Sequence, residues 1–178
     1  KLNLKMIENI DKPALSALWP NKRGMSVVLD LGANIECSSK NLLDFSIMGA
    51  SLYTSLYPNV KPNVALLNIG SEELKGNETI KETYQLLNEK KSDNYNFAGY
   101  IEGNHLMDGK VNVIVSDGFT GNVALKTAEG TANFITSELK NAMTGNLLGK
   151  ISSLLNISNL KKFKKRLDPR LYNGAIFI

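Results

Sequence analysis

Three times along the sequence, a short apolar run rich in β-branched residues is followed by a polar loop and then by a helical pattern. The runs predict strands over residues 26–31, 63–69 and 111–115, and a shorter run predicts another strand over 97–101. Helices are predicted over 39–57 and 77–88, and a long third helix opens near residue 122. Strands that are apolar on both faces and alternate with helices form parallel sheets with helices on both sides. We therefore expect an α/β fold, a three-layer α/β/α sandwich with a mainly parallel sheet.

The predicted third helix supports this architecture through its apolar pattern. Six apolar residues recur at spacings of three and four, which is typical of a single buried stripe: Leu125, Ala128, Ala132, Ile135, Leu139 and Ala142. Gly145 then ends the helix. With 43% hydrophobic and 21% charged residues, the composition is that of a globular chain and not of a disordered one. A single α/β domain over residues 1–178 is expected.

The sequence has too few cysteines and histidines for a disulfide bond or a structural zinc site. One cysteine, Cys37, forbids an intrachain disulfide, and one histidine, His105, leaves no Cys/His cluster for zinc. Neither a metal nor a cofactor is predicted. No apolar run reaches the length of a membrane span, and the first twenty residues lack the apolar core of a secretory signal. The predicted location is the cytoplasm, and the apolar run at the last residues suggests a fragment of a longer chain.

Positive charge is concentrated near the C-terminus. The formal net charge is +4, and residues 144–170 hold seven basic side chains and one acid. Basicity confined to one segment is weak evidence for nucleic-acid binding, so no nucleic-acid partner is predicted. Apolar residues accompany these charges: Leu147, Leu148, Ile151, Leu154, Leu155, Ile157, Leu160 and Phe163. Residues 144–167 are interpreted as an amphipathic, basic helical insertion that lies on an anionic membrane surface, or forms a dimerisation hairpin, or does both.

The loops that follow the three predicted strands point to a ligand site. In open parallel sheets, ligands bind at the carboxyl ends of the strands, where these loops meet. Each loop leads into a helix N-terminus, whose free backbone N–H groups and positive dipole end attract anions. Sequences for dinucleotide binding or a P-loop are absent. A site for phosphate or another oxyanion is therefore the predicted use of this edge.

The third loop, residues 117–122, is the most informative of the three. Asp117 ends the strand, two glycines allow close approach of the backbone, and Thr120 and Asn122 are candidate helix caps. Lys126 follows inside the helix, where a cation needs a compensating acid or bound anion. The alternative is an ordinary glycine-rich turn with a surface pair between Lys126 and Glu129.

The first two loops carry weaker signals. Lys75 precedes a helix with Asn77 as its predicted cap, where a lysine neutralises a phosphate held by the helix end; the alternative is a solvated loop of mixed charge. In the first loop, Asp30 closes the strand, and Gly32 and Asn34 form the turn, with simple turn chemistry as the alternative. Cys37 is interpreted as a buried small residue, and His105 as a residue either at the surface or just behind the site residues.

Four motifs in order along the chain resemble the bacterial phosphate acyltransferase family (PlsX family). They are DLGAN at 30–34, GSEE and KGNE at 70–78, DGFTGNV with LKT and EG at 117–130, and DPR with YNGA at 168–175. The resemblance spans nearly the whole chain, which is similar to the C-terminal part of the longer family sequence. One departure is His105, where the family pattern implies an acid.

The resemblance implies a fold similar to phosphotransacetylases and a homodimer in the cytoplasm, peripherally associated with the inner face of the membrane. The implied reaction moves a long-chain acyl group from acyl carrier protein to inorganic phosphate. Its acyl phosphate product then serves glycerol-3-phosphate acyltransferase in phospholipid synthesis. Two alternatives remain: a coenzyme A-dependent phosphate acetyl- or butyryltransferase, and a non-catalytic membrane-associated fragment.

Site residues are carried over from the matching motifs and loop positions. The predicted catalytic residues are Asp117, Lys126 and Lys75. The predicted substrate-binding residues are Asp30, Gly32, Asn34, Glu72, Asn77, Gly118, Thr120, Gly121 and Asn122. In this hypothesis the two lysines hold phosphate, and the N–H groups of residues 118–122 stabilise the oxyanion. Asp117 orients a lysine or protonates the departing sulfur.

Overall fold

The computed structural model describes residues 10–167 and 176–178 of the chain. Its strands are β1 (Leu15–Asn21), β2 (Gly24–Leu29), β3 (Asn63–Asn68), β4 (Asn96–Glu102), β5 (Val113–Val115) and β6 (Ile176–Phe177). Its helices are α1 (Ser39–Leu56), α2 (Glu78–Glu89), α3 (Gly118–Thr144), α4 (Leu147–Leu155) and α5 (Ile157–Leu167), with a short 3-10 helix at Gly103–His105. The fourth motif of the resemblance, residues 168–175, lies outside the described residues.

The strands form one sheet in the order β4-β3-β5-β2-β1-β6. Neighbours among β4, β3, β5 and β2 pair in parallel, whereas β1 pairs antiparallel with β2 and with β6. The predicted mainly parallel sheet is confirmed. Strand β1 was not among the predicted strands, because Pro20 and polar residues interrupt its apolar pattern.

Alternate residues of the central strands feed two separate apolar clusters. Val27, Val113 and Val64 pack toward α1 and α2, whereas Val28 and Ile114 pack on the other face, toward the first turns of α3. Successive residues of a strand point to opposite faces of a sheet, so these clusters mark two covered faces. The result is the predicted three-layer arrangement, with the carboxyl ends of β2, β3 and β5 at one edge.

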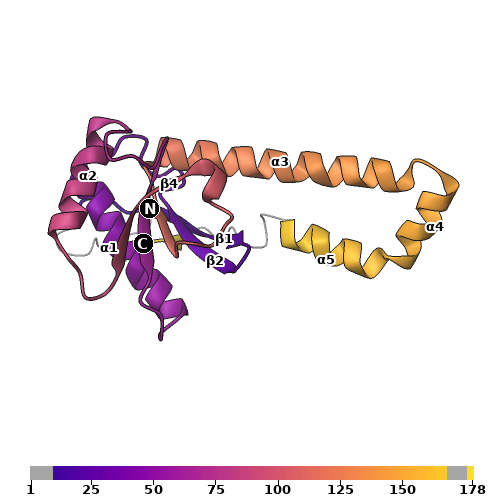
Figure 1. Ribbon diagram of the computed structural model, residues 1–178, viewed down its shortest axis with the longest axis horizontal. Coiled ribbons are helices and arrows are strands. Elements are labelled where there is room, and N and C mark those ends of the chain that lie inside the picture. Colours follow the sequence, from indigo (N-terminus) through magenta and orange to yellow (C-terminus); the bar gives the residue numbers. More distant parts are fainter. Residues whose placement is uncertain (1–9, 168–175) are drawn as a thin grey trace, which may run out of the picture.

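Helix α3 differs from its prediction at its start and in its burial. It begins at Gly118 rather than near residue 122, because the side chain of Asp117 caps it. The predicted buried stripe is wrong for the described structure, in which only Gly118 and Gly121 of this helix are buried. Figure 1 shows the reason: α3 leaves the sheet after its first turns and extends well beyond the α/β body.

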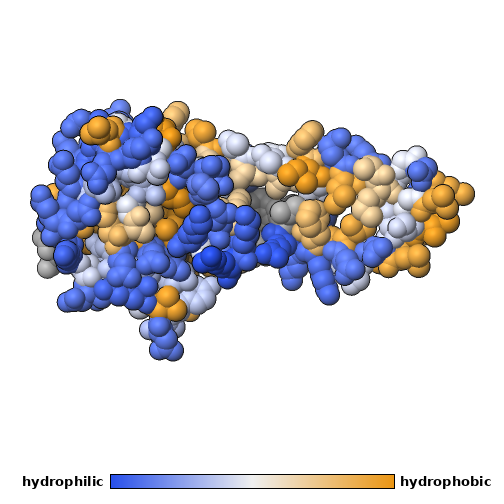
Figure 2. All heavy atoms as spheres, in the orientation of Figure 1, coloured by the Kyte–Doolittle hydropathy of each residue, from blue (hydrophilic) through white to orange (hydrophobic). Residues whose placement is uncertain are grey.

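Helices α4 and α5 complete an arm that α3 begins. Figure 1 shows α4 at the far end and α5 returning toward the body. Figure 2 shows apolar side chains gathered at this tip. In α4, the side chains of Leu147, Leu148 and Leu155 are 75–82% exposed. Within the described residues, none of the helices combines the length and apolar character needed to cross a membrane.

Candidate anion-binding site

The N-termini of α1, α2 and α3 meet around a pocket of about 510 Å³. Its wall draws on all three strand-to-helix loops: Ile35, Glu36, Cys37, Leu42, Asn77, Thr79, Ile80, Asp117, Phe119 and Thr120. Helix N-termini present backbone N–H groups and positive dipole ends, which favour anions. The loops therefore converge as the sequence predicted, and among the named site residues Asn77, Asp117 and Thr120 line the pocket.

Asp30 organises the first loop from within. Its fully buried carboxylate accepts backbone N–H bonds from Leu15, Gly32, Ala33 and Asn34 at 2.7–3.2 Å. The side-chain amide of Asn34 donates to the same carboxylate at 2.8 Å and to the carbonyl of Pro13 at 2.7 Å. Asp30 and Asn34 thus shape the loop that forms one wall of the pocket, and the Asp30 carboxylate and the Asn34 side-chain NH₂ are engaged within the protein.

The glycines of the third loop let α3 approach the first loop. Gly118 donates its N–H to the carbonyl of Asn34 at 2.7 Å, and a Cβ at Gly118 would lie 2.6 Å from that oxygen. A Cβ at Gly121 would overlap the carbonyl oxygen of Asp30. Gly32, at φ 132°, faces the side chain of Asn122. These glycines were expected to let the backbone approach a ligand. In the structure they let it approach the backbone of the first loop instead.

The side-chain caps of α2 and α3 each satisfy one first-turn amide and leave others without an acceptor among the described residues. Asn77 accepts from the amide of Ile80 at 2.9 Å, and Asp117 accepts from both the amide and the hydroxyl of Thr120 at 2.8 Å. The preceding amides, of Thr79 and Phe119, have no acceptor among the described residues, and both residues line the pocket. These two N–H groups are the pocket's free donors at its helix ends.

Lys75 and Glu72 lie in the loop before α2 but do not line the pocket. Both are exposed, and the Lys75 ammonium has no ion-pair partner within residues 10–167 and 176–178. The loop is fixed by its backbone: Asn68 donates to the carbonyl of Lys75 at 3.1 Å, and Gly76 takes a φ of 97°.

Lys126 lies away from the pocket. It is nine positions after the cap Asp117, which corresponds to about 13.5 Å along the helix axis. Its ammonium pairs with Glu129 at 2.9 Å on the exposed surface of α3. The geometry is that of the alternative stated above, and Lys126 and Asp117 are not brought together. Asn122 is exposed beside Gly32, also outside the pocket lining.

Sequence reasoning missed the cation that lies beside the pocket. Lys12 precedes β1 and donates to the backbone carbonyl of Glu36 at 3.0 Å. Burial raises the pKa of the neighbouring Cys37 thiol, and the backbone of Gly118 and the charge of Lys12 offset part of this increase. The thiol is therefore protonated at neutral pH. No motif surrounds Lys12, so no pattern in the sequence could have identified it.

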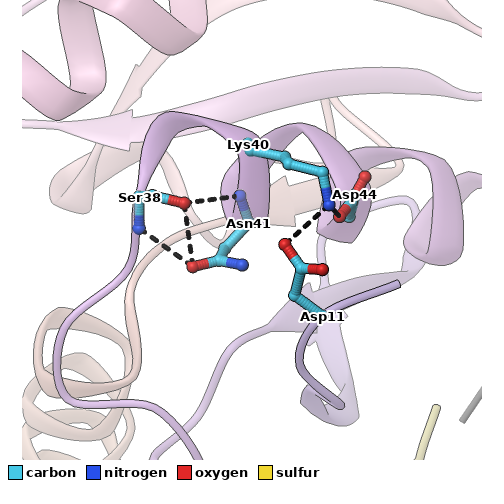
Figure 3. Close-up of polar contacts among 5 residues, drawn as sticks. All are labelled: Asp11, Ser38, Lys40, Asn41 and Asp44. Carbon is cyan, nitrogen blue, oxygen red and sulfur yellow. Dashed lines mark hydrogen bonds and ion pairs between the residues drawn. The ribbon is translucent and has the colours of Figure 1, made fainter. Parts of the chain in front are cut away.

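Residues 11–13, which we call the strap, contact both the first loop and the start of α1. Asp11 pairs with Lys40 at 2.6 Å, Lys12 holds the carbonyl of Glu36, and the carbonyl of Pro13 accepts from Asn34. Figure 3 shows Asp11 and Asp44 on either side of the Lys40 ammonium, beside the capping box of Ser38 and Asn41. The strap fixes the wall of the pocket from outside.

Metal ligands are not clustered in this region. Among the residues that the structure describes, no group of three or more His, Cys, Asp or Glu side chains has the arrangement to hold a metal ion. The pocket's chemistry is that of two carboxylates, a neutral thiol, hydroxyl groups and helix-end amides.

Comparisons with known proteins agree with the fold. A phosphotransacetylase of Staphylococcus aureus (EutD) superposes with a TM-score of 0.59 at 16% identity, over 72% of this chain and 45% of that one. A phosphotransacetylase of Streptococcus pyogenes gives a TM-score of 0.56 at 15% identity, over 72% and 44%. At such identities the likeness establishes a phosphotransacetylase-like fold.

Sequence relatives are much closer. The chain is 82% identical over its full length to the phosphate acyltransferase of Pelagibacter ubique and 43% identical to that of Maricaulis maris. It covers 54% and 51% of these sequences, about half the length of the relatives it matches. The profile of the family described as "Fatty acid synthesis protein" matches residues 1–178. The chain therefore belongs to the fatty acid synthesis protein family, the family of the phosphate acyltransferases.

Proposed function

We propose that the intact protein transfers a long-chain acyl group from acyl carrier protein to inorganic phosphate, giving acyl phosphate for phospholipid synthesis. The observation that carries the proposal is the meeting of three helix N-termini at one pocket with free amides at Thr79 and Phe119. Such a pocket suits phosphate, and the relatives' name supplies the acyl transfer.

The proposed reaction needs no protein nucleophile. A phosphate oxygen attacks the thioester carbonyl carbon, the new C–O bond forms, and the carbonyl oxygen carries the negative charge. The carbonyl then re-forms as the C–S bond breaks, and the sulfur leaves with the electron pair and takes up the proton that hydrogen phosphate loses. Because its raised pKa keeps the Cys37 thiol protonated, that side chain is a poor nucleophile at neutral pH. Helix-end N–H groups stabilise the oxyanion, a contribution of about 3–4 kcal/mol per donor in other enzymes.

Residue roles follow from the positions in the pocket. Asp117, with both oxygens engaged by Thr120, positions the start of α3 and acts on substrate through that geometry. Lys12 contributes the positive charge beside the wall at Glu36. Lys75 is the candidate mobile cation, because its ammonium is exposed and without an ion-pair partner in the described part of the chain. For Lys126 to contact phosphate, its pair with Glu129 would have to open.

A donor comparison tests the proposed function. The intact protein is assayed for phosphate-dependent loss of the thioester with palmitoyl-acyl carrier protein and with acetyl-coenzyme A. Turnover of the carrier-bound acyl group alone supports the proposal, whereas turnover of acetyl-coenzyme A alone supports the short-chain alternative. Absence of turnover with either donor, in a protein that binds both the carrier and vesicles, would favour the non-catalytic reading.

We also propose that the protein is a homodimer that associates with an anionic membrane surface through its arm. The support is exposed apolar surface on helices that pack on little else: Phe134, Ile135, Leu148, Leu155 and Phe163 are 39–82% exposed. Five basic residues lie in α5, the helix that returns from the apolar tip toward the body, and this helix holds no acid. An apolar surface bordered by cations is the pattern that favours anionic lipid.

A further inference from the structure

A second cavity, of about 610 Å³, lies along α3 on the face of the sheet that this helix covers. Its walls are mostly apolar: Trp19 of β1, Leu106 and Met107 after the 3-10 helix, and Leu125, Ala128 and Ile135 of α3. The indole of Trp19 is fixed by a contact from its N–H to the sulfur of Met107 at 3.1 Å. Cavities of this size and character are typical of sites for apolar ligands.

The wall that α3 supplies includes a row of small residues. Ala124, Ala128 and Ala132 all line the cavity and recur four residues apart, which puts them in one row on the helix. These small side chains leave more room along the wall than the side chains of Leu125 and Ile135, which also line it. From Ala124 to Ile135 the helix rises about 17 Å. This cavity, which we call the α3 groove, therefore follows about three turns of the helix.

Positive charge lies at one end of the α3 groove. Arg166 of α5 lines it and donates to the carbonyl of Asn21 at 3.4 Å. Lys22 lines the same end, with an ammonium that is largely exposed while it contacts Asp108. The acid that lines the groove, Glu129, is paired with Lys126. The guanidinium also continues the all-basic surface of α5, so this end favours an anion.

We propose that the α3 groove binds a fatty acyl chain, with the anionic end of the molecule, a carboxylate or acyl phosphate, at Arg166. The apolar lining fits the chain and the basic end fits the head group. The pocket at the helix N-termini, lined by Glu36, Asn77 and Asp117, offers no comparable apolar surface for such a chain. The choice of a fatty acyl ligand rests on the proposed function, whereas the groove and its charge do not.

The test measures the binding of palmitate to the intact protein by isothermal titration calorimetry. The fatty acid is kept below its solubility limit. We expect one molecule per chain, with octanoate bound at least tenfold more weakly because it buries fewer methylene groups. Ala128→Phe fills the groove and should weaken palmitate binding at least tenfold. Gly130→Phe is the matched control, since a Cβ at this position of α3 meets no neighbouring atom, and it should bind like the wild type.

A charge reversal keeps the test independent of groove packing. Arg166→Glu, at an exposed position, should weaken palmitate binding severalfold, whereas Lys91→Glu on the α/β body should not. The proposal is overturned if the wild type fails to bind palmitate, or if Ala128→Phe and Arg166→Glu both bind it like the wild type. It is also overturned if Ala128→Phe converts a dimer to monomers in sedimentation velocity, because a second copy then covers the groove. Active acyl transfer without palmitate binding would leave the proposed function standing.

Discussion

At the residue scale, the tightest constraint is the contact between Gly121 and the first loop. A Cβ at this position would overlap the carbonyl oxygen of the buried Asp30. We expect Gly121→Ala to lower the free energy of unfolding by about 1–3 kcal/mol, the usual range for overpacking in a core. Urea unfolding measures the change. Gly130→Ala, which meets open space in the same helix, is the control and should be neutral or stabilising.

A cluster on the surface predicts a dependence of stability on acid. Asp108 accepts from Lys22 at 2.7 Å and contacts the ring of His105 at 2.8 Å, and these contacts, led by that of Lys22, lower the pKa of its carboxyl to about 2. Because the pKa is lower in the folded state, the contribution is complete above the ordinary value near 3.8 and is lost as the pH falls toward 2.

The corresponding experiment compares the wild type with Asp108→Asn in thermal unfolding at several pH values. The variant should melt at a lower temperature at pH 6, and the two melting temperatures should converge as the pH falls from 4 toward 2. A difference that stays constant over this range would show that the carboxylate contacts do not carry the stabilisation. Asp93→Asn, at an exposed carboxyl, serves as the control.

Cys37 reports on the pocket that it lines. Burial raises the pKa of its thiol, so at pH 7.5 iodoacetamide should alkylate the native protein more slowly than the protein in urea. Because this is the one cysteine of the sequence, mass spectrometry of the whole protein follows the reaction. Millimolar phosphate should slow alkylation further, and sodium chloride of the same ionic strength should not. Equal rates with both salts would contradict phosphate binding at this pocket.

Single residues were predicted with uneven success, and for a physical reason. The loops at the strand ends were found because local chemistry, a glycine or a carboxylate after an apolar run, marks them. Lys12 could not be found, because its contact with Glu36 joins segments 24 residues apart. Asp117 was placed in the site, but its role as the cap of α3 depends on where the helix begins.

At the scale of elements, α1 and α2 agree with their predictions almost to the residue, since each has a clear cap and packs on a covered face. The stripe of α3 has the same periodicity, yet Ile135 is 46% exposed. An apolar period predicts that a surface is available for packing, and it does not say which molecule packs against it. The α3 groove is the use proposed here for the part of the stripe from Leu125 to Ile135.

The helix at the tip of the arm predicts a measurable membrane affinity. Leu155, 82% exposed in α4, should insert among acyl chains, so Leu155→Glu is expected to reduce co-sedimentation with vesicles of anionic phospholipid severalfold. The matched control is Ser158→Glu, which adds the same charge at a neighbouring exposed position. Equal binding by wild type and Leu155→Glu would assign the apolar tip to contacts between protein copies.

At the scale of the whole molecule, the sequence predicted the three-layer body, because alternating strands and helices leave few other arrangements. It did not predict that α3 would project from that body, since the direction of a helix beyond its last packed turn depends on tertiary contacts. The domain boundaries proposed from the sequence, one α/β domain with residues 144–167 as an insertion, stay a prediction. The arm itself begins within α3, before residue 144.

The projecting arm leads to an expectation for assembly. Phe134 is 65% exposed on α3, and burying it against a second copy would remove apolar surface from water. Phe134→Glu should therefore shift a dimer toward monomers in sedimentation equilibrium, while Ser137→Glu on the same helix should leave the distribution unchanged. A wild type that is monomeric at micromolar concentration would contradict the proposed dimer.

Helix α3 starts at the rim of the anion-binding pocket and ends at the apolar tip. Its 27 residues therefore separate the pocket from the tip by about 40 Å. If the tip binds a bilayer, the anion-binding pocket lies at a distance from the lipid headgroups. This distance leaves room for acyl carrier protein to dock at the pocket. The acyl phosphate product would then have to diffuse to the bilayer before a membrane enzyme could bind it.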